Sequence, residues 1–249
     1  MVIPLRDRLP TRRTPWVNRL LVLANVAVFV FLQPWAVPDA CTQQAFFLEH
    51  AAIPAELTQG EPLDAREIAL TTPAGCALSP IEGKPVYRSI ITAMFLHAGW
   101  AHLLFNMLFL WIFGDNVEDR FGHLRYLGFY LLVGAIATVV FVLPSPSSPA
   151  TLVGASGAIA GVLGAYLLLY PRSRITVIVL PLWFLPFTLP ALLVLGLWFF
   201  LQLAETRIDP MSGGGVAYLA HVAGFVAGFL ITRWLGHRKP QPRLPPVRR

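Results

Sequence analysis

The stretch that decides the fold reads Gly154-Ala155-Ser156-Gly157-Ala158-Ile159-Ala160-Gly161-Val162-Leu163-Gly164. It contains no charged residue, and Gly157, Gly161 and Gly164 recur at i, i+4 and i+7. Small residues at this spacing share one helix face and let a second membrane helix approach closely. The stretch therefore predicts a membrane helix packed tightly against a neighbour, with Ser156 in its first turn.

The rest of the chain also has the composition of a membrane protein. Of its 249 residues, 56% are hydrophobic and only 13% are charged, whereas a soluble domain carries about 25% charged residues. Apolar runs fill most of residues 17–236, which we interpret as one integral-membrane domain with lipid as its main partner. Residues 1–16 are then a basic N-terminal tail, and residues 237–249 a tail rich in Pro and Arg.

A transmembrane helix needs about 20 mainly apolar residues. The segments that qualify are 17–37, 92–113, 124–143, 153–170, 187–203 and 216–236. Because Pro181 and Pro186 interrupt the longer apolar run before residue 187, we expect residues 174–186 to lie at the membrane interface. The predicted fold is an all-α membrane protein, a bundle of six transmembrane helices.

The distribution of positive charge predicts the orientation. Most of the 19 Lys and Arg residues lie in the two tails and in the short connections near residues 120–125 and 172–174. Basic segments remain in the cytosol, so both termini are expected there. This pattern explains the net charge of +6 without nucleic acid, because no basic stripe is interleaved with aromatic residues.

The long loop over residues 38–91 is then expected on the outer side of the membrane. It contains both cysteines of the chain, Cys41 and Cys76. They could form a disulfide if that compartment is oxidising, or remain as two unpaired buried thiols. The sequence leaves both alternatives open.

Polar residues inside a membrane domain are costly and therefore mark functional sites. The predicted spans contain five notable ones: His97, His102, Asn106, Ser156 and His221. The second, fourth and sixth spans all run from outside to inside. His102, Asn106, Ser156 and His221 consequently lie at a similar depth near the outer face.

Glycine spacing predicts how two of these residues meet. The sixth span carries Gly224 and Gly228, and His221 precedes Gly224 by three residues on the same helix face. Packing of this face against the glycines of the fourth span brings His221 within reach of Ser156.

Serine and histidine in contact can carry out nucleophilic acyl transfer, with the imidazole as general base. The first turn of a helix offers free backbone N–H groups, and His102 and Asn106 could add donors for an oxyanion. Since the spans contain no Asp or Glu to orient His221, we expect a Ser–His dyad rather than a triad.

These motifs together resemble the rhomboid family of intramembrane serine proteases. Gly154-Ala155-Ser156-Gly157 is similar to the family's nucleophile motif, and Ala220-His221-Val222-Ala223-Gly224 to its base motif. Residues 97–106 resemble the signature of its second span, and Glu118-Asp119-Arg120 the polar end of that span. Tyr87-Arg88 resembles a Trp-Arg pair of the first outer loop, with Tyr in place of Trp. The similarity covers residues 16–236 in matching order.

The resemblance implies an enzyme that cleaves transmembrane protein substrates near the outer membrane face without cofactor or metal. It implies an oxyanion hole of His102, Asn106 and the Ser156 amide, with Gly154, Gly157, His97, Arg88 and Gly224 in supporting roles. Ala160 stands where many members carry an aromatic residue that stacks on the base. We expect a multi-pass protein of a bacterial inner membrane.

Three other functions compete with this interpretation. A catalytically inactive rhomboid-like protein that binds transmembrane clients would lack the serine or the histidine, and both are present. A channel or transporter should carry ionisable residues at the bilayer midplane. A membrane metalloprotease using His97, His102 and His221 should carry an HExxH motif, which is absent.

Overall fold

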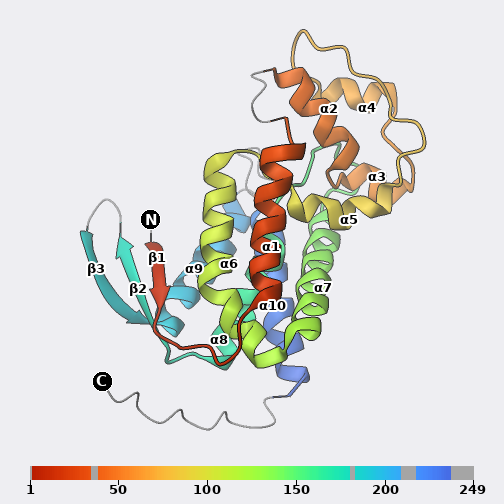
Figure 1. Cartoon of the computed structure of the whole chain (residues 1–249). Coiled ribbons are helices and arrows are strands. Elements are labelled where there is room, and N and C mark those ends of the chain that lie inside the picture. Colours follow the sequence, from red (N-terminus) through yellow and green to blue (C-terminus); the bar gives the residue numbers. More distant parts are fainter. Residues whose placement is uncertain (1, 35–38, 180–182, 209–216, 237–249) are drawn as a thin grey trace, which may run out of the picture.

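A computed structural model describes residues 2–34, 39–179, 183–208 and 217–236 and shows a helical bundle with a small sheet at its side (Figure 1). Six helical segments form the bundle: α1 (Trp16–Ala27) continued by the π-helical η1 (Val28–Leu32), α6 (Trp100–Phe121), α7 (His123–Val142), α8 (Ser156–Leu169), α9 (Ala191–Ile208) and α10 (Tyr218–Trp234). A helix occupies at least part of each of the six segments that the sequence indicated, but residues 187–190 of the fifth belong to a strand, and its helix begins only at Ala191. The predicted tail after residue 236 lies outside the described residues.

The expected start of the second segment is wrong. Residues 86–95 form η2 (Val86–Arg88), α5 (Ser89–Thr92) and η3 (Ala93–Phe95), and α6 begins only at Trp100. The backbone of Gly99 is extended at the helix start, and the chain bends by 79° between the two helical stretches. Composition alone did not reveal this bend, because the residues on both sides of it are apolar.

Among the described helices, α7 alone is long and apolar enough to cross a membrane by itself. If α6 and the residues 86–95 before it count as one bent span, they form a second. The helices over residues 16–32, 156–169 and 191–206 are apolar but shorter.

The expectation of an all-α fold is also wrong, because three antiparallel strands form a sheet in the order β1-β2-β3. The strands are β1 (Val2–Asp7), β2 (Arg174–Val179) and β3 (Trp183–Pro190). Ile3 pairs with Ile178, and Thr176 pairs with Thr188. Residues 175–179 of β2 are all β-branched, which favours a strand. The sheet lies beside α6 and α9 (Figure 1).

The long loop before residue 92, which we call the outer loop after the side of the membrane on which it is expected, contains three short helices, α2 (Ala40–His50), α3 (Pro54–Gln59) and α4 (Ala65–Thr71), at one end of the bundle (Figure 1). They enclose a small apolar core that includes Leu48, Ile53 and Ile68. A buried ion pair joins Lys84 to Glu56. Burial lowers the pKa of Lys84, and its hydrogen bond with Glu56 opposes that effect.

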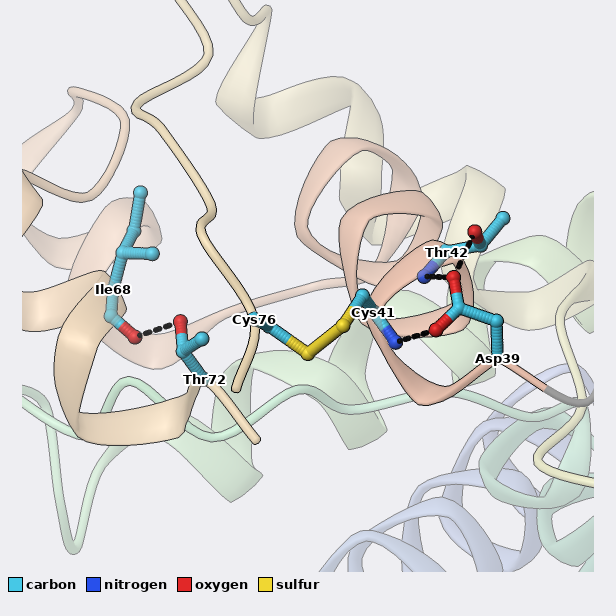
Figure 2. The surroundings of a disulfide bond; sticks show 6 residues. All are labelled: Asp39, Cys41, Thr42, Ile68, Thr72 and Cys76. Atoms are coloured by element: carbon cyan, nitrogen blue, oxygen red, sulfur yellow. Dashed lines mark hydrogen bonds between the residues drawn. A yellow bond between two sulfur atoms is a disulfide. The ribbon is translucent and has the colours of Figure 1, made fainter. Parts of the chain in front are cut away.

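A disulfide joins Cys41 to Cys76 and so decides between the two alternatives that the sequence left open (Figure 2). Cys41 lies in the first turn of α2, whose N-cap Asp39 accepts hydrogen bonds from the Cys41 and Thr42 amides at 3.1 and 3.0 Å. Cys76 lies in the segment after α4. The bridge therefore closes the outer loop upon itself.

The core of the bundle is centred on α8. Residues 157–166 of this helix are all buried, and α6, α7, α9 and α10 each contact it. Glu118 on α6 holds the start of α1, since its carboxylate accepts hydrogen bonds from the Val17 and Asn18 amides at 3.0 and 2.6 Å. The central helix is thus surrounded by the elements that carry the polar residues predicted from the sequence.

Candidate active site

Ser156 is the first residue of α8, in the place where the sequence predicted it. The chain enters the helix through Gly154, whose φ of +125° is a conformation that side chains disfavour. The Gly154 amide donates a hydrogen bond to the Ala93 carbonyl at 2.9 Å, which fixes the turn against η3. Ser156 therefore stands half-buried at a helix N-terminus, where backbone N–H groups are free.

His221 on α10 meets Ser156 directly. Its Nε2 atom lies 2.8 Å from the Ser156 Oγ atom. Close helix packing makes the contact possible, because Gly224 on α10 lies against the backbone carbonyl of Gly157 on α8. A side chain at Gly224 would collide with that carbonyl, so the glycine spacing sets the helix separation.

The other ring nitrogen of His221 has a partner that the sequence analysis missed. Its Nδ1 atom lies 2.6 Å from the Oε1 atom of Gln202 on α9. The expected dyad rested on the absence of Asp and Glu from the spans. The available signal was that Gln202 is the single polar side chain within the apolar run 191–203, which marks the residue without indicating its partner.

His102 borders Gly154, two residues before the serine. A Cβ atom placed on Gly154 would lie 2.9 Å from the His102 Nε2 atom, which is a collision, and 3.6 Å from the Ser156 Oγ atom. The His102 ring and the Ser156 hydroxyl therefore both border Gly154. The Nδ1 atom of His102 accepts a hydrogen bond from the Ala98 amide at 3.3 Å. The proton of the neutral ring is then on Nε2, which faces the region near Ser156 and is ready to donate.

Asn106 is one turn further along α6 and is buried. Its Nδ2 atom donates a hydrogen bond to the His102 carbonyl at 2.9 Å, so the two residues, four positions apart on α6, are in direct contact. An amide nitrogen has two protons, and this bond uses one of them. The contact places the Asn106 amide beside His102, and the described structure shows no hydrogen bond between Asn106 and Ser156.

His97 and Arg88, to which the resemblance gives supporting roles, lie in different surroundings: one is buried beside His102 and the other is exposed. His97 is completely buried, and its ring meets the His102 ring edge-on with centroids 5.1 Å apart. The side chain of Gln33 binds the His97 backbone through both its amide and its carbonyl. Arg88 lies exposed on η2, where it lines a depression of about 220 Å³ with Glu49 and Lys84, away from the Ser156–His221 pair.

The arrangement has the parts needed for acyl transfer. A hydroxyl contacts an imidazole, the imidazole contacts an acceptor on its far side, and donors lie beside the hydroxyl. This is the relationship between nucleophile, base and orienting group that characterises serine hydrolases. Over the described part of the chain, no three His, Cys, Asp or Glu residues lie close enough together to hold a metal ion.

Comparison with known proteins identifies the family. A family model described as "Rhomboid domain" matches residues 84–238, which is more than half of the chain. RHOMBOID-like protein 4 of Arabidopsis thaliana is 30% identical over 87% of this chain and 52% of its own length. RHOMBOID-like protein 6, mitochondrial, of the same plant is 30% identical over 65% of this chain and 54% of its own.

A bacterial protein is similar over a shorter region. Rhomboid protease GluP of Bacillus subtilis is 44% identical over 34% of this chain and 16% of its own length. The chain therefore spans about half, or less, of the length of these curated relatives.

Proposed function

This chain belongs to the rhomboid family, whose members are helical membrane proteins, and we propose that it is an intramembrane serine endopeptidase. Ser156 is the nucleophile and His221 the general base. One observation carries the proposal: the distance of 2.8 Å between the Ser156 Oγ and His221 Nε2 atoms, which belong to residues 65 positions apart in the sequence.

The proposed reaction begins when the Ser156 Oγ atom attacks the carbonyl carbon of the scissile peptide bond, while its proton passes to the His221 Nε2 atom. A tetrahedral intermediate forms and carries the negative charge on the former carbonyl oxygen. The imidazolium returns the proton to the leaving nitrogen as the C–N bond breaks. Water then attacks the Ser156 ester and gives a proton to His221. The imidazolium returns that proton to the Ser156 Oγ atom as the ester C–O bond breaks, which releases the acid product and restores the free serine and the neutral histidine.

The developing oxyanion needs donors that are already in place. We assign this role to the His102 Nε2–H group, to the free Ser156 backbone N–H and to the second N–H of the Asn106 amide. The tautomer of His102 supports its role, because the Ala98 amide occupies Nδ1 and leaves the proton on Nε2. Asn106 contributes in addition by holding the His102 carbonyl.

The proposed substrates are transmembrane segments of other proteins, cleaved near the outer membrane face. The proposal retains six spans with both termini in the cytosol. The Cys41–Cys76 disulfide supports an outer position for residues 38–91, since disulfides persist in oxidising compartments. The names of the relatives include a mitochondrial and a chloroplast protein, so these comparisons do not support the expected bacterial inner membrane.

The test is cleavage of a transmembrane reporter substrate by the purified full chain in liposomes. Wild type should give product, and Ser156→Ala and His221→Ala should each lower the rate by roughly 10³-fold or more. Both variants should retain the helical circular dichroism spectrum of wild type. Equal product from wild type and Ser156→Ala would point to another nucleophile or a contaminant.

Absence of product from all three proteins needs a second measurement. A fluorophosphonate probe reacts with an activated serine without needing the right substrate. Labelling of wild type but not of Ser156→Ala would mean that Ser156 is an activated nucleophile and that the reporter is not a suitable substrate. Absence of labelling would favour a catalytically inactive rhomboid-like protein that binds transmembrane clients.

A further inference from the structure

The face of α9 that meets His221 carries two residues one helical turn apart, Trp198 and Gln202. The Gln202 Oε1 atom lies 2.6 Å from the His221 Nδ1 atom. The Trp198 ring lies 6.0 Å from the His221 ring, centroid to centroid, at an interplanar angle of 32°. Residues at i and i+4 share a helix face, so α9 presents both side chains to the imidazole together.

The contact with Gln202 fixes the position of the imidazole proton. An amide oxygen can accept a hydrogen bond but cannot donate one. The Nδ1 atom of His221 must therefore carry the proton, and the Nε2 atom of the neutral ring keeps its lone pair. That lone pair faces the Ser156 Oγ atom at 2.8 Å, as a general base requires.

We propose that Gln202 is a positioning residue that holds His221 in the tautomer and orientation able to accept the Ser156 proton. The inference rests on the proposed function and extends it from a dyad to a set of three side chains from α8, α9 and α10. The expected dyad followed from the absence of Asp and Glu in the spans, and here a neutral amide takes the place of the missing carboxylate.

The side chains that restrain the His221 ring come from α9, because α8 has only a small side chain at the corresponding position. Ala160, one turn after Ser156, is completely buried and has only a methyl side chain. A Cβ atom at Gly224 would lie 3.4 Å from the Ala160 Cβ atom, so the space between α8 and α10 is already filled there. The ring is instead bounded by Trp198 and, edge-on, by Tyr218 at 6.5 Å between centroids.

An amide suits this position better than a carboxylate. A charged side chain inside a membrane domain is costly, whereas a neutral amide accepts the same hydrogen bond without that cost. The acceptor oxygen is therefore the feature that matters. An isosteric side chain that keeps the oxygen should preserve function, and one that removes it should not.

The first experiment measures kcat and KM of the full chain in liposomes on the transmembrane reporter. Gln202→Met removes the acceptor at nearly constant size and should lower kcat by roughly 10–100-fold with KM little changed. Gln202→Glu keeps the acceptor and should retain activity within a few-fold of wild type. Thr206→Val is the matched control, because the Thr206 hydroxyl on the same helix bonds the Gln202 backbone carbonyl and not its side chain, and it should match wild type.

The second experiment reads the tautomer without catalysis. In protein labelled with 15N-histidine, the His221 resonances are identified by their loss in His221→Asn. Wild type and Gln202→Glu should carry the proton on Nδ1, and Gln202→Met should shift the population toward Nε2. An unchanged tautomer in Gln202→Met, or a kcat equal to that of wild type, would overturn the proposal.

The two experiments separate this inference from the proposed function. If wild type shows neither Ser156-dependent cleavage nor fluorophosphonate labelling, the proposed protease function fails. The tautomer measurement then still tests whether Gln202 accepts a hydrogen bond from the His221 Nδ1 atom. A Gln202-dependent Nδ1 proton would support the positioning, and a Gln202-independent one would overturn it.

Discussion

Gly228 on α10 lies directly against the backbone carbonyl of Gly161 on α8, with no space for a side chain between them. Gly224 meets the Gly157 carbonyl in the same way one turn earlier. These two contacts set the distance between α8 and α10, and His221 lies on the same face of α10. The contact between His221 and Ser156 therefore depends on glycines, which have no reactive side chain.

Gly228→Ala should separate the two helices. The added methyl group would collide with the Gly161 backbone, and overpacking of this kind costs about 1–3 kcal/mol. Gly128→Ala on α7 is the matched control, because a methyl group there meets nothing within 4 Å. The control should be neutral or stabilising by up to about 1 kcal/mol through helix propensity.

Thermal unfolding in detergent and fluorophosphonate labelling of Ser156 check this pair. Gly228→Ala should lose stability and labelling, and Gly128→Ala should lose neither. Equal behaviour of the two variants would contradict the assigned role of the α8–α10 contact.

His102→Leu should lower kcat by roughly 10²–10³-fold, the usual loss when one oxyanion donor is removed. KM should change little, because the oxyanion exists in the transition state and not in the bound substrate. The measurement is steady-state cleavage of the reporter over a range of substrate densities in the liposome.

His50→Gln, in the outer loop, is the control for His102. The His50 ring packs on Phe46 in α2, away from Ser156, and the substitution should leave kcat unchanged. A rise in KM at constant kcat in His102→Leu would assign His102 to substrate binding instead.

Replacing both Cys41 and Cys76 by Ser should destabilise the outer loop by about 2–4 kcal/mol, as the chain-entropy treatment gives for a bridge of this span. The two residues are 35 positions apart, and the loop they close contains α2, α3 and α4. Faster hydrogen exchange over residues 40–76 would show the loss.

The same double variant should keep the Ser156–His221 pair intact. The helices α8 and α10 pack on each other within the bundle, and the disulfide does not touch them. Fluorophosphonate labelling should therefore match wild type. Loss of labelling would mean that the loop holds the site together.

The N-cap of α2 should respond to acid. The hydrogen bond from the Thr42 hydroxyl, followed by those from the Thr42 and Cys41 amides, lowers the pKa of Asp39 below its ordinary value of 3.8. A carboxyl with a depressed folded-state pKa adds stability that is fully present above pH 3.8. The stability is lost as the pH falls through the folded-state pKa.

The rate of disulfide reduction by a phosphine, measured from about pH 6 to about pH 3, checks this cap. Cys41 lies in the turn that Asp39 holds, so opening of the turn exposes the bridge. Asp39→Asn should be reduced faster than wild type at the upper end, and the difference should shrink toward the lower end. A constant ratio across the range would show that Asp39 does not act through its charge.

The candidate nucleophile and base could be predicted from the sequence because their signals are local. Ser156 lies among glycines at helix spacing, and His221 lies three residues before a second pair. Their contact follows once the two small faces pack together. His102 and Asn106 could be singled out as polar residues four positions apart in one span, and their part in an oxyanion hole stays a prediction.

Gln202 was not identified because its role depends on a distant residue. Nothing within α9 distinguishes an orienting amide from any other polar residue in an apolar helix. The partner of Gln202 is 19 residues further along the chain. Likewise, Cys41 and Cys76 could be counted in the sequence, but only the folding of α2 and α4 brings them together.

The sequence by itself determined the approximate places of the apolar helices, though not the starts of α6 and α9, and which face of α8 and α10 is small, because both depend on the composition and spacing of neighbouring residues. Only the tertiary structure decided the sheet, in which Ile3 pairs with Ile178 across most of the chain. It also decided the bend before α6 and the third partner of the Ser156–His221 pair. Strand pairing and side-chain hydrogen bonds join residues that are far apart in sequence, and no local pattern records which distant residue is the partner.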